Sequence, residues 1–154
     1  MTAYPDTSFL CAMYRFQANS QRAAAHFARM SEPLHVASPL LLEFRQSTRW
    51  QVFLHGKDRS KGFDRATAQA ALAMLQSNIA SGALVVVPVE WADIANIAER
   101  LSAQHTWTQG HRVFDILHIA TALHLGAAEF LTFDAHQKQL AGAEGLHVPF
   151  KPLL

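Results

Sequence analysis

The strongest constraint on the fold is a nearly continuous apolar segment that ends in an acid, at residues 112–134. Its pattern predicts a helix from Val113 to Leu125 that is covered on nearly every side. Four polar side chains interrupt the apolar run, namely Asp115, His118, Thr121 and His124. A buried carboxylate such as Asp115 needs a cation, a metal or a hydrogen-bond network as its partner, because burying it unpaired costs several kcal/mol.

A tight turn, a short strand and a second acid follow this predicted helix. Gly126 has the position of the left-handed residue that ends a helix. The apolar run Phe130–Phe133 is a buried-strand candidate that leads directly to Asp134. Functional groups of open α/β sheets gather at the carboxyl ends of parallel strands. We therefore expect Asp134 to lie at such an edge.

The N-terminus repeats this arrangement of strand, acid and helix. Met1–Pro5 is a short strand candidate, and Asp6-Thr7-Ser8 stands between it and an apolar helix predicted for Phe9–Gln17. Asp6 and Asp134 could then meet in one cleft. Taken alone, Asp6 before Thr7-Ser8 is better explained by a local turn or a helix cap.

A third acid, Glu43, stands within a predicted helix. Ser38 as the N-cap and Pro39 at the first helical position favour a helix start there, and the helix is expected to reach about Leu54. Four apolar residues surround Glu43, namely Leu40, Leu41, Leu42 and Phe44. They leave it a narrow polar face, although an ordinary solvent-facing role is equally compatible with the sequence.

These residues resemble the PIN-domain nucleases, and within them the VapC-type endoribonuclease toxins of toxin–antitoxin pairs. The resemblance covers essentially the whole chain and departs from the family at Pro5, where an apolar residue with a backbone N–H is usual. The matching features are Asp6-Thr7-Ser8, Glu43, Arg112-x-x-Asp115-x-x-His118-x-Ala120-x-Ala122, and Leu131-Thr132-Phe133-Asp134 followed by Gln137 and Leu140-Ala141.

The resemblance implies a metal-dependent endoribonuclease. Four residues would be the catalytic and metal-binding acids, namely Asp6, Glu43, Asp115 and Asp134, and Thr7 and Ser8 would support them. Carboxylate oxygens without His or Cys are the ligand set of Mg²⁺ or Mn²⁺, which activate water for phosphodiester hydrolysis. Arg112 would either hold Asp115 or contact the scissile phosphate. The expected partners are the RNA substrate, a VapB-type antitoxin and a second copy of the chain.

The charges are unevenly divided along the chain. Residues 15–65 hold nine of the thirteen Lys and Arg residues but only four acids. Such a basic segment could attract a polyanion, although a charge run taken alone is more often a solvated helical face. The RNA-binding candidates are Arg45, Arg49, Lys57, Arg59 and Lys61. The last of these belong to a polar loop over residues 55–64 that is expected either to contact RNA or to be mobile.

Length and composition favour one domain over residues 1–154. The longest apolar run, residues 83–89, is too short for a membrane span, and no secretion signal begins the chain. The single cysteine, Cys11, is interpreted as a core residue. We therefore expect a cytoplasmic protein.

Strands alternate with helices along the rest of the sequence. Further strands are expected at Leu34–Ala37, Leu84–Pro88 and Leu146–Phe150, with a linker from His105 to His111. The remaining helices are expected from about residue 20 to Met30, from Asp64 as a cap to Ala80, over Trp91–Ala103, and after Asp134 to Ala141. This alternation predicts an α/β fold, a three-layer α/β/α sandwich with a mostly parallel central sheet, which is PIN-like.

Three other classes of protein are alternatives to the nuclease. His111, Asp115 and His118 have the spacing of one helix face and could ligate zinc in a metallohydrolase, but Gly110 places the helix start at or after His111. A phospho-acceptor receiver domain would need a lysine after a late strand, which is missing. A non-catalytic PIN-like binding module would be expected to have lost one of the four acids.

Overall fold

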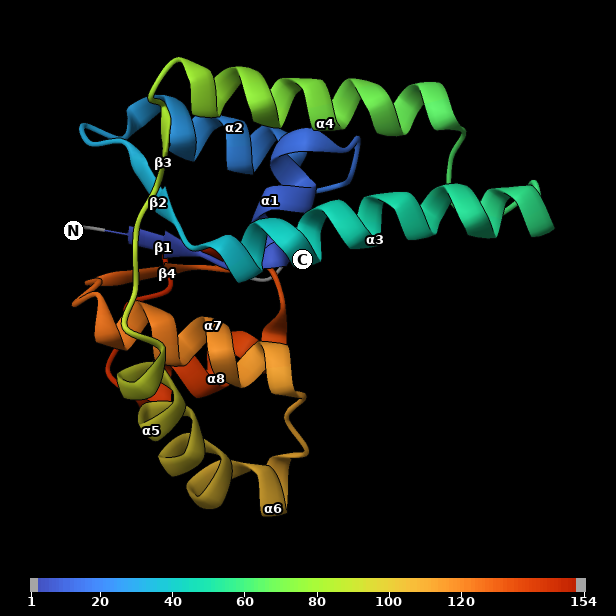
Figure 1. Cartoon of the computed structure of the whole chain (residues 1–154). Coiled ribbons are helices and arrows are strands. Elements are labelled where there is room, and N and C mark those ends of the chain that lie inside the picture. Colours follow the sequence, from blue (N-terminus) through green and yellow to red (C-terminus); the bar gives the residue numbers. More distant parts are fainter. Residues whose placement is uncertain (1–2, 152–154) are drawn as a thin grey trace. The chain divides into compact units, whose positions relative to one another are not determined.

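The computed structural model describes residues 3–151, which form two compact units. Unit 1 comprises the described residues 3–9 and 87–151, and unit 2 comprises residues 10–86. Figure 1 shows the elements in chain order: β1 (Ala3–Pro5), α1 (Thr7–Tyr14), α2 (Ser20–Arg29), β2 (Leu34–Val36), α3 (Ser38–Lys57), α4 (Arg65–Ala80), β3 (Leu84–Val86), α5 (Trp91–Leu101), the π-helical segment η1 (Ser102–Thr106), α6 (Trp107–Gln109), α7 (Val113–His124), β4 (Glu129–Leu131) and α8 (Ala135–Ala143).

Unit 1 contains the strand pair that was expected to carry the acids. β1 pairs in parallel with β4, with Ala3 opposite Glu129 and Pro5 opposite Leu131. Pro5 has no backbone N–H, but the Asp6 N–H continues the pairing by donating to the Leu131 carbonyl over 3.0 Å. Asp6 therefore lies at the carboxyl end of β1, as predicted. Residues 1 and 2 of the first predicted strand lie outside the described residues.

The central helix of unit 1 is α7, which packs against α5, α8 and β1. Its core side is formed by Ile119, Ala120 and Ala122, which are fully buried. Gly126 has a φ of 66° and ends the helix in the left-handed conformation, as predicted. The Ala127 N–H donates to the Ala122 carbonyl over 3.0 Å, which completes a Schellman motif.

The prediction that this helix is covered on nearly every side is wrong at its first turn. Val113 is 72% exposed and Phe114 is 38% exposed, whereas His118 is 3% exposed. The apolar pattern alone does not distinguish a buried first turn from an exposed one, because only neighbouring elements decide which residues lose water.

The predicted linker from His105 to His111 is also wrong. α5 continues through η1 into α6, and the helical path ends only at Gly110, whose φ is 68°. A π-helical turn inserts one extra residue and therefore breaks the 3.6-residue spacing on which the prediction relied. The side chain of Glu144 also holds this segment, since its carboxylate lies 2.8 Å from His105 Nε2 and 2.8 Å from an Arg100 nitrogen.

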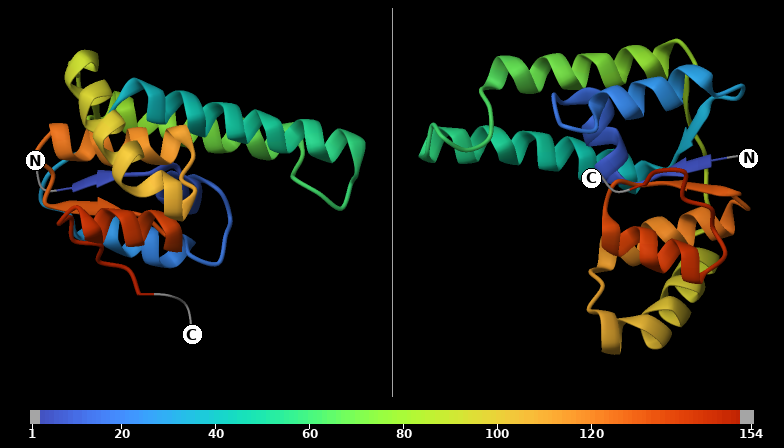
Figure 2. Two further views of the ribbon diagram at one scale, coloured as in Figure 1. Left: turned by 90° about the horizontal axis from the view of Figure 1, so that it is seen from below. Right: turned by 180° about the vertical axis from the view of Figure 1, so that it is seen from behind.

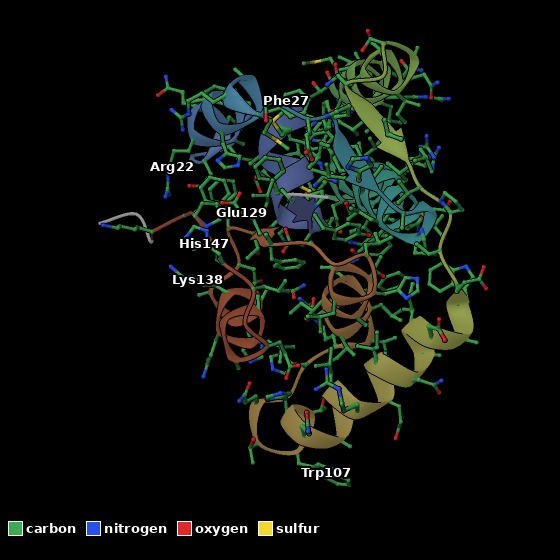
Figure 3. The ribbon with its side chains drawn as sticks, turned by 90° about the vertical axis from the view of Figure 1, so that its left-hand side faces the viewer. Arg22, Phe27, Trp107, Glu129, Lys138 and His147 are labelled. Carbon is green, nitrogen blue, oxygen red and sulfur yellow. The ribbon has the colours of Figure 1, made fainter. Side chains whose placement is uncertain are left out.

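The predicted last strand, Leu146–Phe150, is reduced to one bridge. His147 pairs in parallel with Glu129, and its N–H donates to the Ala128 carbonyl over 3.0 Å. The two side chains also meet, with His147 Nδ1 lying 3.1 Å from Glu129 Oε1 (Figure 3). Pro149 cannot donate to a further ladder bond, which explains why the pairing goes no further.

Unit 2 contains the second parallel pair, β2 with β3, in which Leu34 lies opposite Leu84 and Val36 opposite Val86. α3 and α4 run side by side and are joined at their far end by the loop of residues 58–64 (Figure 2). Asp64 caps α4 by accepting the Thr67 N–H over 2.8 Å, as predicted. The predicted cap of α3 is one residue too late, since Ala37 is its N-cap and Ser38 is already helical.

Two smaller differences concern helix ends. α1 begins at Thr7 rather than Phe9 and ends at Tyr14 rather than Gln17, and Asn19 stands at the cap of α2 without a capping side-chain bond. Cys11 is buried, as expected of a core residue.

The α/β class with parallel strands is therefore confirmed. No helix within residues 3–151 is long and apolar enough to span a membrane. The prediction of one domain over residues 1–154 stays a prediction.

Candidate active site

The carboxylate of Asp6 is buried in unit 1, where it is 2% exposed and accepts three hydrogen bonds. Ser8 Oγ donates to Asp6 Oδ1 over 2.6 Å, and the Phe9 N–H donates to the same oxygen over 3.0 Å. Thr132 Oγ1 donates to the other oxygen, Oδ2, over 2.6 Å. Asp6 thus has the local capping role at α1 that its position allowed, and in addition it bonds to the residue that follows β4.

Burial raises the pKa of the Asp6 carboxyl above its ordinary value, although the bonds from Ser8, Thr132 and the Phe9 N–H and the nearby His118 lower it in part. The negative charge of Asp6 is therefore disfavoured by its surroundings. A divalent cation beside the carboxylate would offset this penalty.

Thr7 and Ser8, both predicted to support the acids, do so differently. Ser8 Oγ accepts the Phe133 N–H over 2.9 Å while donating to Asp6, so it connects the chain segments after β1 and after β4. Thr7 Oγ1 lies 3.4 Å from His118 Nε2. His118 is thus a packed residue that bonds beside the site.

Asp115 occupies the third position of α7, and both of its oxygens have partners. Oδ2 lies 3.3 Å from Arg112 Nε and accepts the N–H of the N-cap residue Arg112 over 3.4 Å, which is the acidic half of a capping box at the helix start. Oδ1 accepts a bond from Gln137 Nε2 over 3.3 Å. The Arg112 side chain is 83% exposed, so most of its guanidinium is open to solvent while Nε contacts Asp115.

Asp134 caps α8 from the end of the β4 segment. Its Oδ1 accepts the N–H groups of His136 over 2.8 Å and of Gln137 over 3.0 Å. The Gln137 side chain does not bond back to complete a capping box. It bonds to Asp115 instead.

A continuous hydrogen-bond path therefore joins three of the predicted acids within unit 1. Asp6 bonds to Thr132, Thr132 Oγ1 accepts the Asp134 N–H over 3.0 Å, and Gln137 connects Asp134 to Asp115. In the sequence, Thr132 and Gln137 belong to the matching motifs, but no role in the site was predicted for either residue. The available signal was a threonine in an otherwise apolar strand end and a glutamine three residues after an acid.

The chemistry of these side chains fits a divalent cation that prefers oxygen ligands. Within residues 3–151, however, no three Asp, Glu, His or Cys side chains converge closely enough to hold a metal ion by themselves. Binding would therefore require water among the ligands or a closer approach of the carboxylates. The assignment of Asp6, Asp115 and Asp134 as metal ligands stays a prediction.

Glu43 and the basic candidates belong to unit 2. Glu43 is half-buried on α3, so its grouping with the other acids stays a prediction. Arg45 is half-buried, and the other candidates are exposed, namely Arg49, Lys57, Arg59 and Lys61.

The loop that carries several of these bases is anchored to α3. His55 Nδ1 lies 3.0 Å from the Lys61 carbonyl oxygen, and Lys61 Nζ lies 3.6 Å from Asp58 Oδ2. Gly62 has a φ of 60°, and a Cβ at this position would overlap the carbonyl oxygen of Gln51. Only glycine therefore allows the loop to approach the helix so closely.

The geometry does not produce the zinc face of the alternative hypothesis. α7 begins at Val113, so His111 lies outside the helix that carries Asp115 and His118. His111 Nε2 bonds to Gln109 Oε1 over 2.8 Å, and its ring stacks on that of His136 with centroids 4.2 Å apart. Burial, followed by the neighbouring His136, lowers the pKa of His111.

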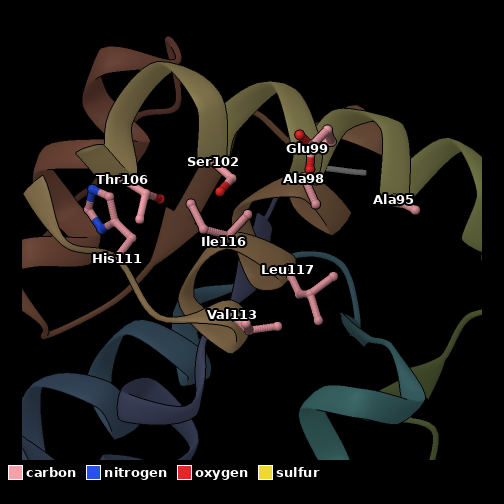
Figure 4. A pocket seen from close by; sticks show the side chains of 9 residues that line it. All are labelled: Ala95, Ala98, Glu99, Ser102, Thr106, His111, Val113, Ile116 and Leu117. Carbon is pink, nitrogen blue, oxygen red and sulfur yellow. The ribbon is translucent and has the colours of Figure 1, made fainter. Parts of the chain in front are cut away.

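A separate cavity of about 390 Å³ lies between α5, η1 and α7 in unit 1 (Figure 4). Its walls are mainly apolar and include Ala98, Val113 and Ile116. The first and last residues of η1, Ser102 and Thr106, also line it. Asp6, Asp115 and Asp134 are absent from its lining residues, so this cavity is distinct from the hydrogen-bonded acids.

Comparisons with known proteins agree with this architecture. VapC20 of Mycobacterium tuberculosis, a sarcin–ricin loop cleaving toxin, superposes with a TM-score of 0.64 at 18% identity, covering 92% of this chain and 95% of its own. A toxin–antitoxin complex from Klebsiella pneumoniae gives 0.63 at 14% identity, covering 98% and 99%. FitAcB from Neisseria gonorrhoeae gives 0.60 at 16% identity, covering 98% of each chain.

No curated protein sequence matches this chain significantly. The family described as PIN domain, in contrast, matches residues 3–143, which include both strand pairs and all four predicted acids. Fold, strand-end acids and family match agree, and the chain belongs to the PIN domain family.

Proposed function

We propose that this protein is a metal-dependent endoribonuclease, the VapC-type toxin of a type II toxin–antitoxin system, with Mg²⁺ or Mn²⁺ as its cofactor. The observation that carries the proposal is the hydrogen-bond path that joins Asp6, Asp134 and Asp115 within unit 1. Membership of the PIN domain family supports it, as does the similarity of the fold to toxins and toxin–antitoxin complexes.

The protein's own residues would hold and orient the reacting groups. When bound, a divalent cation would supply positive charge beside the scissile phosphate and lower the pKa of water. Asp6, Asp115, Asp134 and Glu43 would hold it. Ser8 and Thr132 keep the Asp6 carboxylate in one orientation by donating to separate oxygens. Arg112, whose guanidinium is largely exposed, would contact the phosphate while Nε retains Asp115.

The basic residues of unit 2 would bind the RNA backbone. Arg49, Lys57, Arg59 and Lys61 are exposed on α3 and the adjoining loop, where cations can neutralise phosphates. The further partners under this proposal are a VapB-type antitoxin and a second copy of the chain, and the location is the cytoplasm. The complexes of toxin and antitoxin with similar folds support the antitoxin.

The deciding experiment is cleavage of a labelled single-stranded RNA by the purified chain. Activity is expected with Mg²⁺ or Mn²⁺ and is expected to vanish in EDTA, since the ligands are carboxylate oxygens. Full activity in EDTA, or restoration by zinc alone, would contradict the proposal. Absence of cleavage with every divalent cation, together with tight RNA binding, would favour a non-catalytic PIN-like binding module.

A further inference from the structure

Gln137 bonds to two of the acids in the described part of the site. Its backbone bonds to Asp134, and its side chain bonds to Asp115. Its N–H donates to Asp134 Oδ1 over 3.0 Å, and its Nε2 donates to Asp115 Oδ1 over 3.3 Å. Both bonds come from the first turn of α8, where the backbone is fixed by the cap at Asp134. The residue therefore relates the positions of two acids from different elements.

The Gln137 side chain is better suited to hold Asp115 than the other partner of that carboxylate. Gln137 is 4% exposed, so packing restricts its rotamers, whereas Arg112 reaches Asp115 with a side chain that is 83% exposed. Gln137 acts on Oδ1 and Arg112 on Oδ2, so the two bonds together set the plane of the carboxylate. Only the Gln137 bond is protected from solvent competition on its donor side.

The amide oxygen of Gln137 gives a second, independent observation. Oε1 is buried and has no hydrogen-bond partner among the described residues. Reversing the amide would place this oxygen against Asp115 Oδ1, where two acceptors would face each other. The amide is therefore held in its orientation by Asp115 although this leaves its own oxygen unsatisfied, which is typical of a residue retained for a site rather than for stability.

We propose that Gln137 is a positioning residue that sets the orientation and separation of the Asp115 and Asp134 carboxylates for cation binding. This inference rests on the proposed function, because it concerns the same acids. Outer residues that orient metal-binding side chains commonly change affinity or activity by about 10- to 100-fold when they are replaced. A residue that only fills space in α8 would have no such effect.

The test compares Gln137→Met with Gln139→Met, a matched change at an exposed position of the same helix. Methionine has a similar length and removes the amide while keeping the packing. Mn²⁺ affinity is measured by calorimetry without RNA, and melting temperature is measured in EDTA. For Gln137→Met we expect the Mn²⁺ Kd to rise about 10- to 100-fold, with little change in melting temperature and a loss in kcat rather than in KM. The Gln139→Met control should match the wild type.

A double-mutant cycle with Asp115→Asn separates positioning from other effects. In the Asp115→Asn background, Gln137→Met should cause no further loss of Mn²⁺ affinity, because its target is already altered. An unchanged Kd in Gln137→Met, or a lower melting temperature with unchanged Kd, would overturn the positioning role and leave the proposed function intact. A wild-type chain that binds no Mn²⁺ would instead overturn the proposed function and this inference together.

Discussion

Thr132 Oγ1 donates to Asp6 Oδ2 over 2.6 Å, between residues that are 126 positions apart in the chain. The same hydroxyl accepts the Asp134 N–H over 3.0 Å, so it serves the acids that follow β1 and β4 at once. Thr132 is 1% exposed, and water cannot readily replace either bond. This hydroxyl consequently determines how the two strand ends are held together.

Replacing Thr132 with valine is expected to destabilise the protein by about 1–3 kcal/mol, because a buried carboxylate oxygen loses its donor and a backbone N–H loses its acceptor. The melting temperature should fall by roughly 2–4 °C for each kcal/mol. Thermal or urea unfolding measures the change. Thr121→Val is the control, since the buried Thr121 hydroxyl donates only to the Leu117 carbonyl of its own helix. An equal loss in both variants would deny Thr132 a special role.

Replacing Asp115 with asparagine separates a structural from a functional role. The variant keeps the size of the side chain and one acceptor oxygen, so a residue that only caps the helix would tolerate it with a modest loss of stability and little loss of activity. If Asp115 binds the cation, cleavage should be abolished, and the rise in melting temperature caused by Mg²⁺ should shrink. In EDTA the variant should be as stable as the wild type or more stable, because like-charge repulsion is relieved.

Cleavage and melting curves with and without Mg²⁺ are the measurements for this variant. Asp93→Asn, a change at an exposed acid in the first turn of α5, is the matched control and should behave as the wild type. An Asp115→Asn protein that cuts RNA at nearly the wild-type rate would return Asp115 to a structural role and remove the centre of the proposed site.

The surroundings of Glu144 predict that the stability of the folded protein falls in acid. Burial alone would raise its pKa, but the hydrogen bonds from Arg100 and His105 outweigh burial and leave the pKa below its ordinary value of 4.5. A carboxyl whose pKa is lowered by folding stabilises the folded state above its unfolded pKa and loses that contribution as the pH falls through the folded pKa. Part of the stability should therefore disappear below pH 4.5.

The variant Glu144→Gln isolates this contribution. At neutral pH it should melt below the wild type, and the difference should narrow as the pH is lowered through the acid range. Differential scanning calorimetry at a series of pH values measures both proteins. A difference in melting temperature that is constant with pH would show that the charge of Glu144 contributes nothing.

A homodimer is expected from the apolar residues that remain exposed. Trp50 is 51% exposed, Phe53 is 50% exposed and Trp91 is 46% exposed, and the first two stack with ring centroids 4.9 Å apart. Phe44 on the same helix is fully buried, while Leu54 and Phe63 are half-buried. Exposed aromatic residues of this kind commonly mark interaction surfaces.

Light scattering at micromolar concentration should give twice the chain mass of 17.1 kDa. Trp50→Lys places a charge among the exposed aromatic residues of α3 and should shift the equilibrium toward the monomer. A monomer at all micromolar concentrations for the wild type would refute the dimer.

Several parts of this structure could be predicted because short-range rules decide them. Gly126 ends α7 because only its left-handed backbone closes the Schellman motif, and Asp64 caps α4 because its side chain reaches the Thr67 N–H. Asp6 and Asp134 follow their strands in sequence, so their places at strand ends follow from the order of elements alone. The α/β class follows from the same alternation.

Other parts depended on which segments pack together. The π-helical turn at residues 102–106, the exposure of Val113 and the burial of Phe44 are set by neighbouring elements, and no local pattern contains that information. The acids themselves could be identified from the sequence. No role was predicted for Thr132 and Gln137, the side chains that connect them. Hydrogen bonds between residues far apart in the chain form only after the strands and helices have packed, so only the tertiary structure decided that Thr132 bonds to Asp6 and Gln137 to Asp115.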